Sequence, residues 1–64
     1  RLTAMQKEYG LTARETELLA HLYRFESNTE IADALGIRDN TLQKHLQNLF
    51  RKLGVASKWE ILRL

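Results

Sequence analysis

The sequence contains no cysteine and no proline, and it has only three glycines among its 64 residues. Without cysteine the chain can form neither a disulfide bridge nor a thiolate metal site, and this suits a reducing cytosol. No apolar run approaches the roughly 18 residues of a membrane-spanning helix, and no segment resembles a signal peptide. We therefore expect a cytoplasmic protein without a membrane partner, a metal or another cofactor.

The chain is also too short for a deep substrate cleft, because 64 residues make one small domain at most. Its two histidines, His21 and His45, have no cysteine beside them for a metal site, and we expect His21 to be half-exposed on a helix. Pairs of glutamates are better explained by helix caps and solvation than by acid–base catalysis. The sequence thus predicts a non-enzymatic binding function. Since it begins at Arg1 without an initiator methionine, we expect a piece of a longer protein.

Charge is unevenly distributed along the chain. Residues 1–35 carry four basic and six acidic residues, a net charge of −2, whereas residues 36–64 carry six basic and two acidic residues, a net charge of +4. A basic half is the electrostatic feature expected of a surface that meets phosphate groups, although solvated helix faces are often basic too.

Helix signals run through the whole sequence, so the fold class is predicted to be all-α. Three segments fit the capping box, in which a Ser or Thr caps a helix and a Glu three residues on reaches back: Thr12–Glu15, Ser27–Glu30 and Ser57–Glu60. With glycines where the patterns stop, they predict four helices near 13–24, 28–35, 39–53 and from about 58. Residues 1–10 are either a short leading helix or a linker.

Apolar residues at helical spacing predict the core. The expected core residues are Leu18, Leu19, Leu22, Phe25, Ile31, Ala32, Leu35, Leu42, Leu46, Leu49, Phe50 and Leu53.

The link between the second and third of these helices is very short. Gly36 can take the left-handed conformation that ends a helix, Ala32 is small enough for a close helix crossing, and Leu42 can fill the angle between the helices. A short helix, a tight glycine turn and a longer amphipathic helix are typical of a helix-turn-helix. An ordinary helical hairpin is the alternative, and the basic second half favours DNA binding.

From Leu11 to Leu62 the sequence resembles the LuxR-type helix-turn-helix domain of bacterial response regulators and quorum sensors. The matching segments are Leu11-Thr12-Ala13-Arg14-Glu15, Ser27-Asn28-Thr29-Glu30-Ile31-Ala32, Leu35-Gly36-Ile37, Thr41-Leu42-Gln43-Lys44-His45-Leu46 and Lys52-Leu53-Gly54-Val55-Ala56-Ser57-Lys58. The promoter-binding region of sigma factors shares the opening motif and a similar turn, and it remains the nearest alternative. The resemblance implies a DNA-binding effector domain over 11–64, following a receiver or ligand-binding domain.

The resemblance places residues 39–53 in the major groove of double-stranded DNA, with Gln43, Lys44 and Gln47 at the base-reading positions. Independently, Gln can pair with adenine and Lys can donate to guanine acceptors. A merely solvated polar face is the alternative. Residues around this face are expected to contact the DNA backbone: Ser27, Asn28, Arg38, Thr41, His45, Arg51, Lys52 and Lys58.

Three residues depart from the LuxR pattern. Phe25 stands where a glycine commonly ends the first helix, so that helix must stop by another route or run on. Arg38 replaces the usual Ser cap, which leaves Asp39 as the expected cap of the third helix. Gln43 stands where Lys is frequent, and it favours adenine over guanine as a partner.

The fourth helix is the dimer contact that the resemblance implies, with Trp59, Ile61 and Leu62 as the candidate residues of a homodimer. Packing of these residues into the core of one chain is the alternative. From another class of function, a helical protein-interaction module that binds no DNA also stays open.

Overall fold

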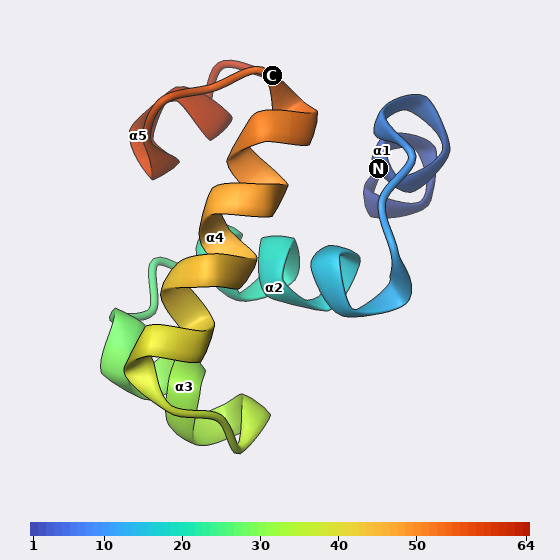
Figure 1. Ribbon diagram of the computed structural model, residues 1–64. Coiled ribbons are helices and arrows are strands. Elements are labelled where there is room, and N and C mark those ends of the chain that lie inside the picture. Colours follow the sequence, from blue (N-terminus) through green and yellow to red (C-terminus); the bar gives the residue numbers. More distant parts are fainter.

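The computed structural model describes residues 1–64 and contains five helices and no strand. They are α1 (Leu2–Tyr9), α2 (Ala13–Tyr23), α3 (Asn28–Leu35), α4 (Asp39–Leu53) and α5 (Lys58–Ile61) (Figure 1). This confirms the all-α class, and the segment before Gly10 is a helix rather than an irregular linker. None of the five helices is both long and apolar enough to cross a membrane.

Two of the three expected capping boxes are present. At the start of α2, Glu15 N donates to Thr12 Oγ1 at 3.1 Å and Thr12 N donates to Glu15 Oε1 at 2.8 Å. Ser27 and Glu30 make the same pair of bonds at the start of α3. These bonds satisfy backbone N–H groups that have no partner inside the helix, so each helix begins where the sequence pattern predicted.

The third expected capping box, at Ser57, is wrong. Ser57 precedes α5 but its side chain makes no capping bond. Glu60 Oε2 instead accepts from Ala56 N at 2.7 Å. The carboxylate therefore bonds one residue further back than the motif requires, and α5 is a single turn.

The expected cap of α4 is also wrong, because Arg38 rather than Asp39 occupies the capping position. Arg38 has an extended backbone, with φ −84° and ψ 160°, and its side chain makes no capping bond. Asp39 is the first helical residue, where its negative charge favours the positive end of the helix dipole. Asn40 Oδ1 accepts from Thr41 N at 2.8 Å and so satisfies one free N–H of this turn.

Gly36 makes the tight turn between α3 and α4. It is left-handed, with φ 68°, and Ile37 N donates back to Ala32 O at 3.0 Å. A methyl group on Gly36 would meet nothing within 4 Å. Glycine is therefore required here by the backbone conformation and not by lack of space.

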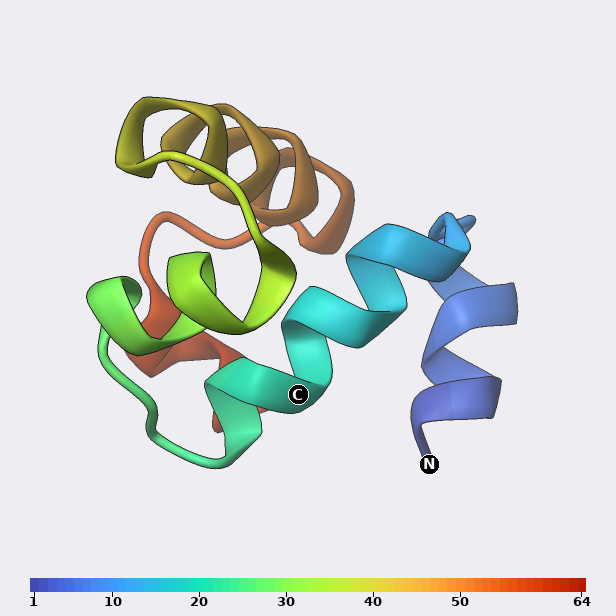
Figure 2. The ribbon, with the colours of Figure 1, turned by 90° about the horizontal axis from the view of Figure 1, so that it is seen from below.

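One apolar core joins all five helices. It contains Met5, Leu11, Leu18, Leu19, Leu22, Ile31, Ala32, Leu42, Leu46, Leu49, Leu53 and Ile61. Leu35 and Phe50 pack against it while partly buried. Figure 2 shows α1 beside α2, with α4 running across α2 so that its last turn lies near the start of α2. The α2 helix thus packs against both α1 and α4, and α3 packs against α4.

Phe25 does not belong to the core, contrary to the sequence-based expectation. Its side chain is 69% exposed, and its φ of 60° makes it the only residue other than glycine with a left-handed backbone. The α2 helix ends at Tyr23, and Phe25 N donates to Leu22 O at 3.0 Å. Phe25 therefore ends the helix by adopting the conformation that a glycine would adopt, which turns its ring away from the apolar face of α2.

Candidate nucleic-acid interface

The α3 helix, the Gly36 turn and the α4 helix form a helix-turn-helix. The 15 residues of α4 make a helix about 22 Å long. One face of α4 is held in the core by Leu42 and Leu49, which are fully buried, and by Leu46 and Leu53. Figure 1 shows α4 crossing α3 and leaving its outer side uncovered.

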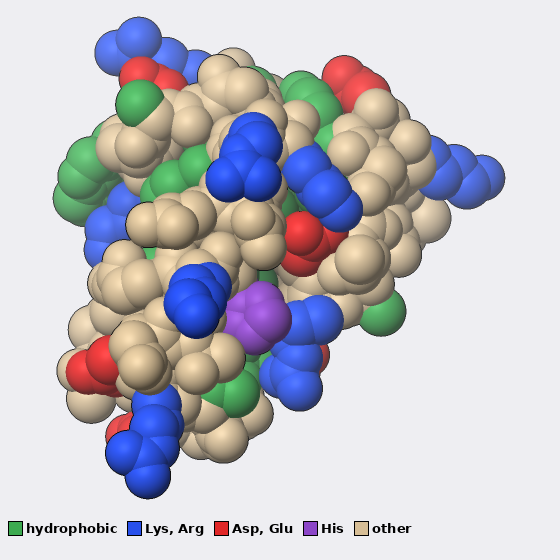
Figure 3. Space-filling model, viewed as in Figure 1, with side chains coloured by type: hydrophobic (Ala, Val, Ile, Leu, Met, Phe, Trp, Pro, Cys, Tyr) green, Lys and Arg blue, Asp and Glu red, His purple; other side chains and the backbone are tan.

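The three expected base-reading residues, Gln43, Lys44 and Gln47, all lie on the outer side of α4 and are exposed. The side-chain bonds of α4 are made by other residues, such as Asn40 and Arg51. The amides of the two glutamines and the ammonium of Lys44 are therefore free to bond to another molecule. In Figure 3, Lys and Arg side chains are spaced along this side of α4.

The start of α3 contributes Ser27 and Asn28. The Ser27 N–H is taken by Glu30 Oε1 at 2.8 Å, and its hydroxyl oxygen accepts from Glu30 N at 3.1 Å. These bonds lower the pKa of the exposed Glu30 carboxyl, so a negative charge stays beside this helix end. Asn28 Oδ1 is buried without a hydrogen-bond partner. An anion at this end of α3 would thus meet the hydroxyl proton of Ser27 and the backbone N–H groups that follow Ser27 in the first turn.

Other expected phosphate contacts surround the outer side of α4. Arg38 is exposed beside the turn, while Thr41 and His45 are half-buried along the flank. Arg51 is exposed, and its Nη1 donates to Asn48 Oδ1 over a long 3.5 Å. All four residues lie on α4 or directly before it.

Lys52 and Lys58 have partners inside the domain. Lys52 Nζ lies 2.8 Å from Glu15 Oε1 and 3.2 Å from Gly10 O. Lys58 Nζ lies 5.7 Å from the centre of the Trp59 ring, within the range of a cation–π contact. The sequence offered no signal for the Lys52 pair, since Glu15 is 37 residues away.

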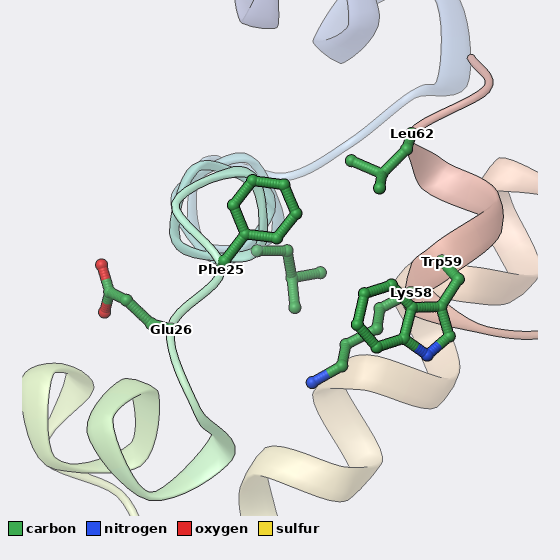
Figure 4. A pocket seen from close by; sticks show the side chains of 6 residues that line it. Phe25, Glu26, Lys58, Trp59 and Leu62 are labelled. Atoms are coloured by element: carbon green, nitrogen blue, oxygen red, sulfur yellow. The ribbon is translucent and has the colours of Figure 1, made fainter.

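The expected dimer residues on α5 and directly after it divide into two groups. Trp59 is 64% exposed and Leu62 is 48% exposed, whereas Ile61 is 1% exposed. Ile61 is therefore a core residue and has no surface to offer a partner. Figure 4 shows Phe25 facing Trp59 and Leu62 across a small notch, which Leu22, Glu26 and Lys58 also line.

His21 is buried rather than half-exposed, and it is 9% exposed. Its Nδ1 lies 2.9 Å from Glu26 Oε1, and Arg24 Nη1 lies 3.3 Å from Glu26 Oε2. Glu26 therefore joins the end of α2 to the loop that leads to Ser27. No three His, Cys, Asp or Glu side chains come together in a group that could hold a metal ion.

A tight glycine turn, a buried face on α4 and a polar basic face opposite define a helix-turn-helix DNA-binding domain. The model of the luxR family of bacterial regulatory proteins matches residues 9–64. The chain therefore belongs to the luxR family, which supports this assignment over the sigma-factor alternative. It is a DNA-binding domain of the kind found in transcriptional regulators.

Among its relatives is the probable transcriptional regulatory protein SgaR of Hyphomicrobium methylovorum, 52% identical over 49 residues, which are 77% of this chain and 23% of SgaR. The uncharacterized transcriptional regulatory protein YhcZ of Bacillus subtilis is 43% identical over 53 residues, 83% of this chain and 25% of YhcZ. The regulator MalT of Yersinia pestis is 42% identical over 50 residues, 78% of this chain and 6% of MalT. The chain thus spans about a quarter or less of these relatives, and no solved structure matches it.

Proposed function

We propose that the chain binds promoter or operator DNA by inserting α4 into the major groove, where Gln43, Lys44 and Gln47 contact base edges. The observation that carries this proposal is the position of these three side chains, exposed opposite the buried leucines of α4. The major groove admits an α-helix and presents a distinct pattern of donors and acceptors for each base pair. The two glutamine amides suit adenine, and Lys44 suits guanine.

Contacts to the phosphates would hold α4 in register. The hydroxyl of Ser27 and the N–H groups at the start of α3 face one strand, together with Asn28. Arg38, Thr41, His45 and Arg51 flank α4 and serve the neighbouring phosphates. Lys58 is a weaker candidate, because its ammonium is directed toward Trp59. Such contacts supply most of the salt-dependent affinity and carry no sequence information.

The proposed setting is the C-terminal effector domain of a longer cytoplasmic regulator. The three relatives are about four times as long as the matched segment or longer, which leaves room for a receiver or ligand-binding domain. A response regulator of a two-component system is one protein of this kind. Residues 1–10 would then form the connection, and residues 11–64 the DNA-binding domain.

A homodimer on two half-sites is the proposed working form. Phe25, Trp59 and Leu62 are the large apolar side chains exposed around the notch. An aromatic side chain offers about 150–250 Å², so these three residues offer on the order of a few hundred Å². A stable interface buries about 800 Å² on each partner. The dimer is therefore expected to be weak in solution and to assemble on DNA.

A salt series tests DNA binding. Fluorescence anisotropy with an arbitrary 20-base-pair duplex is expected to give a logarithm of affinity that falls linearly with the logarithm of salt concentration, with a slope near −0.9 for each phosphate contacted. Lys7→Gln is the control for the loss of one positive charge away from α4, because Lys7 is exposed on α1 and makes no ion pair. No binding at low salt, or an affinity that does not change with salt, would contradict the proposal and favour a protein-interaction module.

A further inference from the structure

The last turn of α4 is attached to the start of α2 by a charged group. Lys52 Nζ donates to Glu15 Oε1 at 2.8 Å and to Gly10 O at 3.2 Å. The side chain of Glu15 is 10% exposed and that of Lys52 is 37% exposed. The ammonium of Lys52 is thus occupied inside the domain on the side of α2, although the sequence predicted that it meets DNA.

The oxygen atom of Glu15 that bonds to Lys52 also accepts a second hydrogen bond. This atom, Oε1, accepts from Thr12 N at 2.8 Å, as part of the capping box that begins α2. Burial alone would raise the pKa of the Glu15 carboxyl, but the hydrogen bonds from Lys52 and Thr12 and the Lys52 charge together lower it. The carboxylate is therefore charged at neutral pH, and its ion pair with Lys52 is in place.

Gly10 brings a third element to this point. It ends α1 in a left-handed conformation, and the luxR family model begins only at residue 9. Most of α1 thus precedes the part that the family shares, yet Met5 of α1 is buried and accepts a bond from the Tyr23 hydroxyl at 3.6 Å. One ammonium therefore connects α4 with both α2 and α1.

We propose that Lys52 is a positioning residue for DNA recognition, which fixes the direction of α4 by joining its last turn to Glu15 and Gly10. The inference rests on the proposed function of α4. Binding sites work when their side chains are held within about 0.5 Å and 10–20° of the productive geometry. Without this connection only apolar contacts hold the last turn, and such contacts are not directional. Tilting of α4 would misplace Lys44 and Gln47 against base edges more than it would disturb phosphate contacts.

A change at Glu15 separates this role from that of a phosphate contact. In Glu15→Gln, the amide oxygen can still cap α2, since the capping box accepts Glu or Gln, but the charged partner of Lys52 is lost. If Lys52 served phosphates, Glu15→Gln would release it and remove a negative charge, so DNA affinity would rise. If Lys52 positions α4, recognition of the preferred sequence becomes weaker.

The experiment compares Lys52→Gln, Lys52→Arg and Glu15→Gln with the unmodified chain and with the Lys7→Gln control. The probes are a duplex selected from a random pool by the unmodified chain and an arbitrary duplex of equal length, and binding is followed by fluorescence anisotropy across a salt series. We expect Lys52→Gln and Glu15→Gln to weaken binding to the selected duplex by about tenfold, the value of one good base contact. Binding of these two variants to the arbitrary duplex should change about as little as that of Lys7→Gln. Lys52→Arg should bind both duplexes with the affinity of the unmodified chain.

Circular dichroism on each variant ensures that only folded chains are compared, and Glu15→Gln and Lys52→Arg keep the test available if Lys52→Gln does not fold. The proposal is overturned if Glu15→Gln binds the selected duplex as tightly as the unmodified chain or more tightly. It is also overturned if Lys52→Gln weakens both duplexes equally and lowers the salt slope by about 1, as a lost phosphate contact would. If the unmodified chain binds no duplex at all, the proposed function itself fails.

Discussion

At the scale of single residues, Phe25 is the clearest case of a local conformation that the sequence does not favour. A left-handed backbone costs roughly 1–2 kcal/mol for a residue with a Cβ atom, and the exposed ring recovers little of this by burial. Strained residues of this kind tend to occur at functional sites. The position of the ring at the notch, beside Trp59 and Leu62, is consistent with the proposed dimer surface.

Replacement of Phe25 tests the strain directly. We expect Phe25→Gly to have a free energy of unfolding about 1 kcal/mol higher than Phe25→Ala, because only glycine adopts this φ without strain. Phe25→Ala is the matched control, since it also removes the ring but keeps the Cβ atom. Urea denaturation measures both, and equal stability of the two variants would show that residue 25 is not strained.

At the scale of elements, the sequence predicts most of the helices because each one begins and ends with local chemistry. Thr12 and Ser27 mark two helix starts, and Gly36 marks the turn that sets α3 against α4. The prediction fails where several residues compete for one role. Ser57 and Asp39 were expected to be caps, but Glu60 bonds to Ala56 and the turn after Gly36 makes Arg38 the capping residue.

The outer face of α4 could be predicted from the sequence, because helical periodicity separates Gln43, Lys44 and Gln47 from the leucines. The internal partner of Lys52 could not be predicted. Glu15 and Gly10 are 37 and 42 residues away, and only the packing of α4 on α2 brings the three together. The sequence assigns Phe25 to the core for a similar reason. The helical spacing of apolar residues extends beyond Tyr23, where α2 ends.

At the scale of the whole molecule, the outer face of α4, which we propose reads DNA, and the aromatic side of the notch are formed by different residues, so each can be changed without changing the other. We expect Trp59→Ala to leave binding to a single half-site unchanged. Its affinity for two half-sites one helical turn apart should fall at least about tenfold, because joining two binding events raises affinity by 10²–10⁴. Anisotropy titrations on single-site and double-site duplexes measure both quantities.

The two outcomes that contradict this prediction differ in meaning. An unchanged affinity for the double site would show that the notch does not join two chains. An equal loss of affinity for the single site would show that Trp59 contributes to DNA binding or to the stability of the domain. Ile61 serves as a reference for the second case, because its buried side chain makes any Ile61→Ala effect a consequence of core packing.

The proposed function requires that the exposed side of α4 reads base sequence. The most direct measurement is selection of duplexes from a random pool, carried out in parallel with the unmodified chain and with Gln47→Ala. We expect the variant to lose preference at one base position of each half-site and to keep its preference elsewhere, since one bidentate contact specifies one base pair. An identical sequence preference for the two proteins would contradict base reading by Gln47 and the orientation of α4 proposed here.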